Sequence, residues 1–245
     1  MKNIFGRIWA CWGLVWFVVT MLVFMIPYII IYYQREPRRT FRFIAVSRMW
    51  MGIFMPMVGC PVRIKGKENF APGENYVVIC NHNAFIDVPV SSPGIPGGNK
   101  TIAKAELAKT PLFGMLYKMG SVLVDRKSEA SRRESFTSMK QILAMGLHMC
   151  IYPEGTRNRS DQPLKPFHDG AFRLAIATGK PLMPALIFNS RKVMPEKPVF
   201  SLYPHTMGFH FLPPVKIAST DTVESLKEKL FGIMSAYYAA NSKKF

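Results

Sequence analysis

A long uncharged segment lies near the start of the chain: no residue from Ile8 to Tyr33 is Asp, Glu, Lys or Arg. A helix rises about 1.5 Å per residue, so this segment is long enough to cross a hydrocarbon core of about 30 Å. It is longer than the apolar part of a cleaved signal peptide, and no small-residue cleavage site follows it. The sequence therefore predicts a membrane-embedded helix, beside which the rest of the chain must fold.

Aromatic and basic residues mark the ends of this segment, as in membrane helices with interfacial belts. They are Trp9, Trp12 and Trp16, then Tyr28, Tyr32 and Tyr33, followed by Arg35, Arg38, Arg39 and Arg42. A second uncharged stretch, Met49 to Val62, is too short to span and contains Pro56 and Pro61, so we expect it to lie in one leaflet or turn back. Residues 1–62 are thus predicted to be a membrane anchor that either spans once or forms a two-helix hairpin.

The charge balance favours a membrane surface as partner. The chain has 32 Lys and Arg against 15 Asp and Glu, a net charge of +17, and 49% of its residues are hydrophobic. Basic and apolar character together suit anionic lipid. The basic residues are spread along the chain and no nucleic-acid motif appears, so no nucleic-acid partner is expected. A non-catalytic module that binds anionic lipid or nucleic acid is the alternative of another class.

The cysteines and histidines give no sign of a disulfide framework or a metal site. The four cysteines have no CxxC spacing and lie in apolar segments, as reduced, buried thiols usually do. The five histidines form neither HExxH nor a Cys/His array, so no metal is predicted. Cys80 ends an apolar run, which favours packing over reactivity, and GxSxG is absent.

After Val62 short apolar runs alternate with amphipathic stretches, which predicts an α/β fold with a mostly parallel sheet flanked by helices. The expected strands are 76–80, 101–103, 121–125, 149–153 and 182–188, and the expected helices are 106–118, 131–145 and 171–178. Strand-like pieces follow Val199, and Asp221 with Glu224 resembles a capping box that opens a last helix, ending near Ala240. Ser91 to Gly98 is expected to be a flexible loop. Residues 63–245 form the second predicted domain.

The stretch NHNAFID, residues 81–87, follows the first predicted sheet strand. Sites of parallel α/β sheets form beyond the carboxyl ends of strands, and a histidine with a carboxylate on its second ring nitrogen suits general-base catalysis. His82 and Asp87 are therefore candidates for a base and its orienting carboxylate. Asn and Asp also serve turns and helix caps, and spacing alone favours this second interpretation.

Two more polar stretches follow predicted strands. GSVLVDR places Arg126 at a strand end, where a guanidinium suits phosphate or carboxylate, although a surface ion pair is equally compatible. YPEGTRNRS places Glu154, Gly155, Thr156 and Arg157 on a loop in which the glycine permits a tight turn. Three polar turns at three strand ends favour a site over chance.

In this order, NHNAFID, GSVLVDR, YPEGTRNRS and LMPALIF resemble the four signature blocks of the glycerolipid acyltransferases, specifically the PlsC-type 1-acylglycerol-3-phosphate O-acyltransferases. The resemblance extends over about residues 60–220, and its first and third blocks are the most specific. It implies that His82 is the general base and that Asp87 holds the imidazole. It further implies contact with the acceptor and its phosphate by Lys104, Arg126, Glu154, Gly155, Thr156 and Arg157, and a structural or acyl-pocket role for Pro184.

The same resemblance implies the reaction: transfer of a fatty acyl group to the free hydroxyl of a lysophospholipid acceptor, 1-acylglycerol 3-phosphate, forming phosphatidate. Acyl-CoA or acyl-carrier protein is the expected cosubstrate, with no metal or other cofactor. Ala84 stands where the family commonly has serine, which leaves the acceptor less certain than the reaction. Glycerol 3-phosphate or a lyso-aminoacyl lipid is the alternative acceptor. The expected location is a bacterial inner membrane, with the catalytic domain on the cytoplasmic side.

Overall fold

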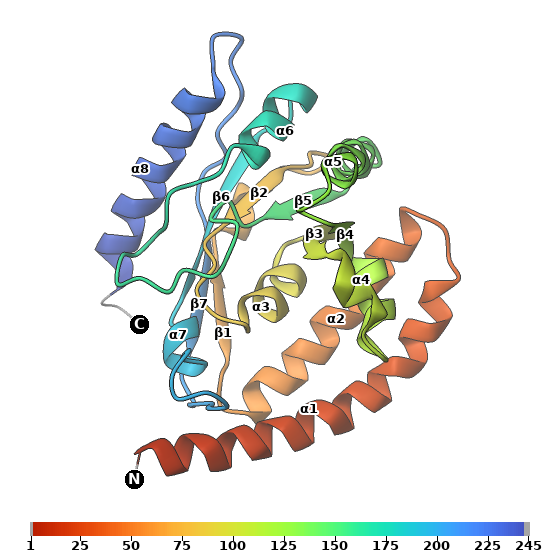
Figure 1. Cartoon of the computed structure of the whole chain (residues 1–245), viewed down its shortest axis with the longest axis vertical. Coiled ribbons are helices and arrows are strands. Elements are labelled where there is room, and N and C mark those ends of the chain that lie inside the picture. The colour runs from red at the N-terminus through yellow and green to blue at the C-terminus, as the bar shows by residue number, and fades with distance from the viewer. Residues whose placement is uncertain (1, 243–245) are drawn as a thin grey trace.

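A computed structural model describes residues 2–242 and places one sheet at the centre of the molecule (Figure 1). In this part of the chain, seven strands run in the order β1-β7-β6-β2-β5-β3-β4, and all neighbours are parallel except β6 and β7. The strands are β1 Val62–Lys65, β2 Val77–Cys80, β3 Asn99–Lys104, β4 Ser121–Val124, β5 His148–Ile151, β6 Leu182–Phe188 and β7 Met207–Phe211. The predicted α/β class with a mostly parallel sheet is confirmed.

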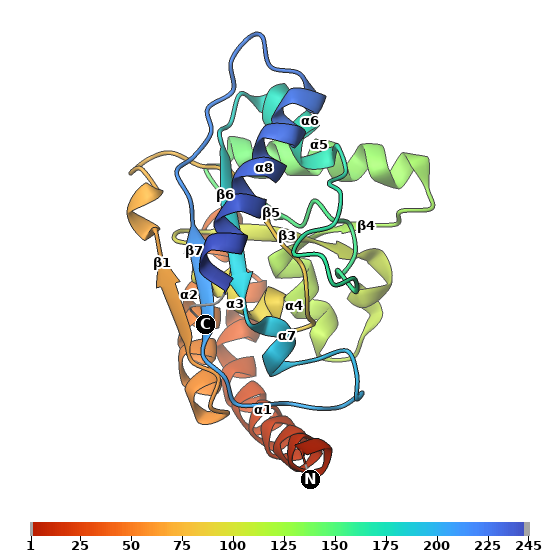
Figure 2. The ribbon, with the colours of Figure 1, turned by 90° about the vertical axis from the view of Figure 1, so that its left-hand side faces the viewer.

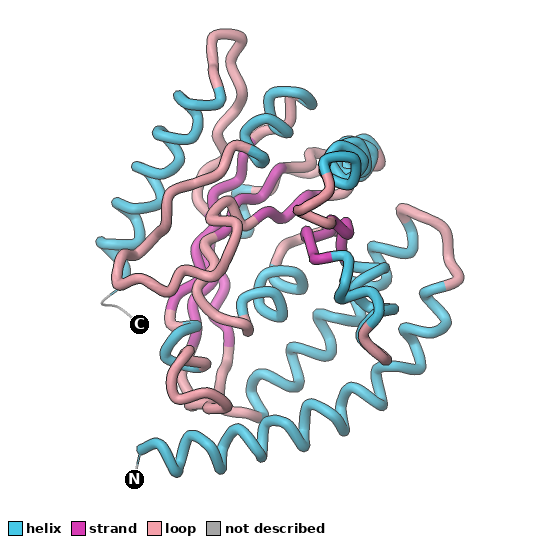
Figure 3. Tube along the Cα trace, in the orientation of Figure 1, coloured by secondary structure: helices cyan, strands magenta, loops and turns pink. Residues whose placement is uncertain are grey.

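Helices cover both faces of the sheet, as Figures 1 and 3 show. One face packs against α1 Lys2–Tyr32, α2 Arg38–Met57, α3 Asp87–Gly94 and α4 Phe113–Gly120, and the other against α5 Glu129–Ala144, α6 Gly170–Thr178 and α8 Val223–Asn241. Val78 and Cys80 of β2 enter the first core, whereas Val77 and Ile79 enter the second. This alternation is what a strand buried on both sides requires. The short elements are η1 Lys67–Asn69, η2 Ala105–Lys109 and α7 Ser190–Val193.

The five expected strands are present with small shifts at their ends, whereas two further strands lie toward one edge of the sheet (Figure 2). β7 occupies one of the strand-like pieces after Val199. β1 was not predicted, because VRIK alternates exposed charged residues with half-buried apolar ones and is only four residues long. It pairs with β7 alone, so the start and the end of the α/β region meet at this edge.

Three local predictions were wrong. Ser91 to Gly98 is not a loop throughout, because α3 extends to Gly94 and buries Ser91. The helix expected at 106–118 is divided into η2 and α4, since Pro111 disfavours helical backbone at the preceding residue. The capping box lies one residue later than expected: Thr222 and Ser225 cap α8.

The N-terminal region is a pair of packed helices. The Tyr28 hydroxyl lies 2.8 Å from the Ser47 hydroxyl, and Trp50 Nε1 donates to Thr20 Oγ1 at 2.9 Å. Of the stretch expected to lie in one leaflet or turn back, residues 49–57 form the second half of α2. Among residues 2–242, α1 is the one helix long and apolar enough to cross a membrane, and 28% of its most apolar window is buried in the structure. Many of its other large apolar side chains, from Ile4 to Ile30, are exposed.

The helix pair is joined to the sheet by polar contacts as well as by the shared core. Glu36, at the turn between α1 and α2, accepts a hydrogen bond from Lys100 Nζ of β3 at 2.7 Å and another from Arg39. The Lys100 and Glu36 side chains are only 6% and 16% exposed. Arg48 of α2 donates to the carbonyl oxygen of Pro93 in α3. The hairpin is therefore part of the folded body.

Replacing Glu36 with Gln should lower the free energy of unfolding by about 2–4 kcal/mol, because the Lys100 ammonium stays buried without a counter-charge. Thermal unfolding in detergent measures this loss. Glu129→Gln, which breaks an ion pair whose partners are 81% and 67% exposed, is the control and should cost no more than about 0.5 kcal/mol. Equal losses in the two variants would contradict the role assigned to Glu36.

The same variant should show a defined pH dependence. Burial alone would raise the pKa of Glu36, but hydrogen bonds from Lys100, Thr40 and Arg39 and the Lys100 charge lower it to about 2. This value lies below the ordinary Glu pKa of about 4.3, so the stabilisation is complete above about pH 4.3 and is lost as the pH falls toward 2. The difference in stability between wild type and Glu36→Gln should shrink over that interval.

Candidate active site

The polar residues singled out in the sequence follow four strands that are neighbours in the sheet. In the order β2, β5, β3 and β4, the carboxyl ends lead to His82, to the loop 154–157, to Lys104 and to Arg126. All neighbouring pairs in this set are parallel, so these ends meet at one edge of the sheet. The fold gathers residues that are far apart in the sequence.

His82 and Asp87 are in direct contact. His82 Nδ1 lies 2.9 Å from Asp87 Oδ2, and the same oxygen accepts the backbone N–H groups of Asn83 and Ala84 at 2.6 and 2.7 Å. Asp87 is the first residue of α3 and is fully buried. It therefore closes the turn that opens the helix and also contacts the imidazole, so the geometry is compatible with both interpretations of NHNAFID.

The backbone of His82 is held by the loop that follows β5. Its N–H donates to Glu154 Oε1 at 2.8 Å, and its carbonyl accepts from the Asn158 N–H at 2.6 Å. Glu154 Oε2 accepts from the N–H of Lys165, and the Glu154 residue is 1% exposed. Burial raises the pKa of Glu154, and these hydrogen bonds partly oppose the rise. Glu154 thus joins the backbone of His82 to the backbone of Lys165.

Tyr152 supports the imidazole from one side and was not singled out in the sequence. Its ring stacks on that of His82, with centroids 4.4 Å apart and planes inclined by 27°. Its hydroxyl lies 2.6 Å from Ser91 Oγ. Ser91 and Asp87 stand four residues apart on α3 and therefore lie on one side of the helix. Asp87 contacts the edge of the imidazole. Ser91 contacts Tyr152, which stacks on the face of the ring. That spacing would have indicated Ser91, had the segment not been assigned to a loop.

Three basic side chains belong to or contact the loop 154–157. Arg126 Nη1 donates to the carbonyl oxygen of Gly155, whose φ of 71° is the left-handed geometry that glycine permits. Arg157 is exposed, and its guanidinium lies 5.9 Å from the centre of the Phe85 ring. Lys165, a second residue missed in the sequence, donates from Nζ to Thr156 Oγ1 at 2.8 Å.

Lys104 is exposed at the end of β3, between the strands that lead to Arg126 and to the loop 154–157. The site therefore combines an oriented imidazole with several cations on one sheet edge. This chemistry suits an anionic substrate that loses a proton. Among residues 2–242, no group of three or more His, Cys, Asp or Glu side chains is arranged to hold a metal ion.

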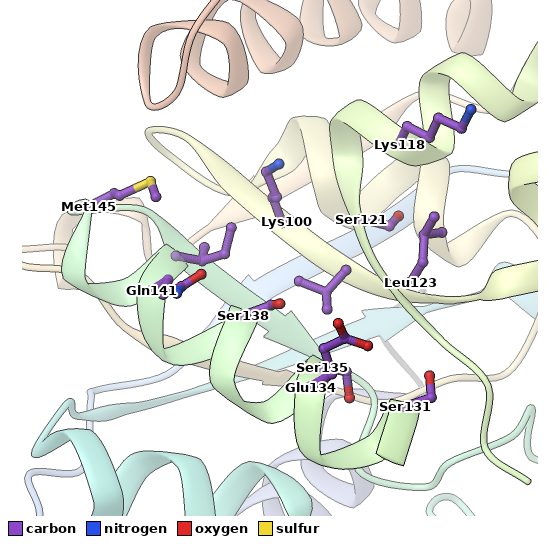
Figure 4. Close-up of a pocket in the computed structure, with 12 residues that line it drawn as sticks. Lys100, Lys118, Ser121, Leu123, Ser131, Glu134, Ser135, Ser138, Gln141 and Met145 are labelled. Atoms are coloured by element: carbon purple, nitrogen blue, oxygen red, sulfur yellow. The ribbon is translucent and has the colours of Figure 1, made fainter. Parts of the chain in front are cut away.

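Two cavities lie outside this constellation. One of about 390 Å³ lies between β4 and α5, and Figure 4 shows Ser131, Ser138 and Gln141 around it. None of the predicted site residues lines it. The second, of about 290 Å³, adjoins the site at Asn83 and extends toward Arg191 and Tyr238. His82 lines neither cavity, and its side chain is 18% exposed.

Sequence comparison gives relatives with a shared name. A 1-acyl-sn-glycerol-3-phosphate acyltransferase from Cocos nucifera is 32% identical over 137 residues, which are 55% of this chain and 44% of the relative. A protein of the same name from Salmonella typhimurium is 28% identical over 162 residues, 65% of each chain. The chain thus spans about half to two thirds of the length of these relatives.

Structure comparison extends the likeness to the N-terminal helices. The crystal structure of the 1-acyl-sn-glycerophosphate acyltransferase PlsC from Thermotoga maritima superposes with a TM-score of 0.81 at 19% sequence identity, covering 98% of this chain and 97% of that one. At this identity the likeness shows the fold alone. Residues 61–188, more than half of the chain, match the family model described as Acyltransferase. That match contains the imidazole, its carboxylate and the loop 154–157, and the chain belongs to the acyltransferase family.

Proposed function

We propose that the protein transfers a fatty acyl group from a thioester to the free hydroxyl of 1-acylglycerol 3-phosphate, forming phosphatidate. The observation that carries the proposal is the contact of His82 Nδ1 with Asp87 Oδ2 at 2.9 Å, on a sheet edge that also carries cations. The names of the relatives from Cocos nucifera and Salmonella typhimurium support the choice of acceptor.

In this reaction Nε2 of His82 takes the proton of the acceptor hydroxyl as its oxygen attacks the thioester carbonyl. The carbon–sulfur bond of the resulting tetrahedral intermediate then breaks, and the proton passes from the imidazolium to the leaving thiolate. The Asp87 carboxylate stabilises the imidazolium and fixes the tautomer. Glu154 and Tyr152 position the ring, since they bind its backbone and its face. Acyl-CoA or acyl-carrier protein supplies the thioester.

The acceptor phosphate is bound by the cations around the imidazole. Arg157 and Lys104 are exposed at the strand ends, and Arg126 is tied to the same loop through Gly155. A guanidinium pairs with phosphate oxygens through parallel hydrogen bonds, which fixes orientation as well as charge. The acceptor hydroxyl is thereby directed toward His82.

The helix pair holds the protein on the bilayer, where the acceptor and the product reside. The folded body packs against α1 along most of its length, from Gly6, whose carbonyl accepts the Leu202 N–H, to Ile31 in the core. A helix covered in this way lies along the membrane within one leaflet, because crossing would draw the body into the hydrocarbon. In a bacterial cell the body then lies on the cytoplasmic side of the inner membrane.

His82→Ala should lower kcat by about 10²- to 10⁴-fold, the usual contribution of a positioned general base. The measurement is transfer of labelled acyl groups from acyl-CoA and from acyl-carrier protein to lysophosphatidate in detergent. His205→Ala, at an exposed histidine, is the matched control and should keep normal turnover. Near-normal activity of His82→Ala would refute the mechanism. Transfer only to glycerol 3-phosphate or a lyso-aminoacyl lipid would change the acceptor.

Tyr152 should act through its ring more than through its hydroxyl. Tyr152→Phe keeps the stacked ring and should retain most of kcat, whereas Tyr152→Leu should lower kcat about three- to tenfold with little change in KM, since a stacked pair contributes about 0.5–1.5 kcal/mol. The pH profile of kcat separates this effect from a structural one. If the two variants behave alike, stacking on His82 has no part in positioning.

Arg157→Ala should raise KM for the acceptor about 10- to 100-fold with a smaller change in kcat, because it removes hydrogen bonds from a charged donor. Arg159→Ala is the control, since Arg159 lies on the same loop but pairs with Glu196 at 2.9 Å. Titrating lysophosphatidate at saturating donor gives both constants. An unchanged acceptor KM in Arg157→Ala would remove the phosphate role.

A further inference from the structure

Two apolar residues adopt a backbone conformation that their side chains disfavour. Among residues 2–242, the non-glycine residues with positive φ are Leu112, Asn189 and Phe200, at 63°, 64° and 56°. Asn tolerates this region, whereas Leu and Phe rarely adopt it. Such strain persists where something other than local preference requires it.

These two residues are also exposed. Leu112 is 55% exposed and Phe200 52%, and Val199, beside Phe200, is 78% exposed. Packing within the protein therefore does not explain the strain. Each of the two loops turns a large apolar side chain outward.

The loops that contain Leu112 and Phe200 both contact α1 through neighbouring residues. Phe113, next to Leu112, stacks on Phe17 with ring centroids 6.0 Å apart. Two residues after Phe200, the Leu202 N–H donates to the Gly6 carbonyl at 3.0 Å. In Figure 2 the loop after α7 extends beside the N-terminal end of α1, and in Figure 1 the loop before α4 points toward the middle of that helix.

Small residues on α1 make room for the second loop. A Cβ atom on Gly6 would lie 2.5 Å from the Tyr203 ring, and one on Gly13 would lie 2.7 Å from Leu202 Cδ2. The two glycines are seven residues apart and so share one face of the helix. The loop packs against this face, so the position of its exposed tip, Val199 and Phe200, is fixed relative to α1.

α1, which both loops contact, also exposes apolar side chains. Large apolar side chains are exposed along the whole helix: Ile4, Phe5, Ile8, Trp12, Leu14, Val15, Val18, Val19, Leu22, Val23, Ile26, Ile29 and Ile30. Lys109 and Lys197 are exposed three residues before Leu112 and Phe200, respectively. An apolar tip with a nearby lysine suits the boundary between acyl chains and anionic headgroups.

We propose that Leu112 and the pair Val199–Phe200 are two membrane-inserting tips, which enter the same leaflet as α1 and flank it. This inference rests on the proposed placement of the helix pair. The loops meet α1 near Gly6 and Phe17, about 16 Å apart along the helix at about 1.5 Å per residue. Contacts at two separate points fix the rotation of the body about α1, and hence the height of His82 above the membrane.

The test measures depth at single labelled positions. Cys11 is exposed and is replaced by Ser, while Cys60, Cys80 and Cys150 are buried and do not compete for label. In this background Leu112→Cys and Phe200→Cys carry an environment-sensitive fluorophore, in vesicles of phosphatidylcholine and phosphatidylglycerol with nitroxide-labelled acyl chains. Insertion gives a blue shift and quenching at both positions.

Two further labelled variants make every outcome decisive. Ile26→Cys on α1 is the positive control, and Ile176→Cys on α6, 37% exposed and on the other face of the sheet, is the negative control. Quenching at Leu112 and Phe200 comparable to that at Ile26 supports the proposal. If Ile26→Cys is quenched but the labels at positions 112 and 200 are as unquenched as the label at 176, the proposed tips do not insert, while α1 still lies in the membrane. An unquenched Ile26 overturns the anchor and the tips together.

Glycine variants separate membrane contact from folding. Leu112→Gly and Phe200→Gly relieve the positive-φ strain and remove the apolar side chain, so thermal stability in detergent should not fall. Exchange of protein from loaded to empty vesicles should become about tenfold faster, the ratio expected for one large apolar side chain. Turnover in detergent micelles should stay unchanged. Exchange at the wild-type rate would contradict the proposal.

Discussion

One hydrophobic core is shared by the sheet and the N-terminal helix pair. Ile44 and Phe54 of α2 lie in the same cluster as Val78 of β2 and Phe209 of β7, so one face of the sheet would lose much of its cover without the hairpin. α1 of the hairpin also exposes large apolar side chains from Ile4 to Ile30. Because a single element serves both surfaces, the position of the site relative to that exposed surface is set by side-chain packing and not by a linker.

In the candidate site, too, single residues make several contacts. Asp87 opens α3, completes the turn after β2 and contacts the imidazole of His82, all through one oxygen. Glu154, which follows β5, binds the backbone of His82 after β2 through one oxygen and the backbone of Lys165 through the other. The groups that would take part in proton transfer are therefore held by bonds that the fold requires in any case. This is the preorganisation on which electrostatic stabilisation of a transition state depends.

The sequence predicted the central strands well, because continuous apolar runs followed by Gly and polar turns leave few alternatives. The sequence analysis missed elements and side chains whose position depends on strand pairing or on contacts with residues far away in the chain. β1 is a short strand with alternating exposure, and it is stabilised by pairing with β7, which lies more than half the chain away in the sequence. α3 was not predicted because Pro93 and Gly94 are typical of loops, and so the i, i+4 spacing of Asp87 and Ser91 on one helix was missed as well. Tyr152 was hidden because stacking leaves no pattern along a chain.

The pairing of β1 with β7 also determines the order in which the molecule can be completed. Val62–Lys65 leave the ribosome shortly after the helix pair, but their partner, Met207–Phe211, follows only near the end of synthesis. Domains are made from the N-terminus, and long-range pairing is slow. Throughout that interval the face of the hairpin that later packs against the sheet has no partner within the chain. On the proposed membrane placement, the bilayer is the surface that can cover this face until the sheet has formed.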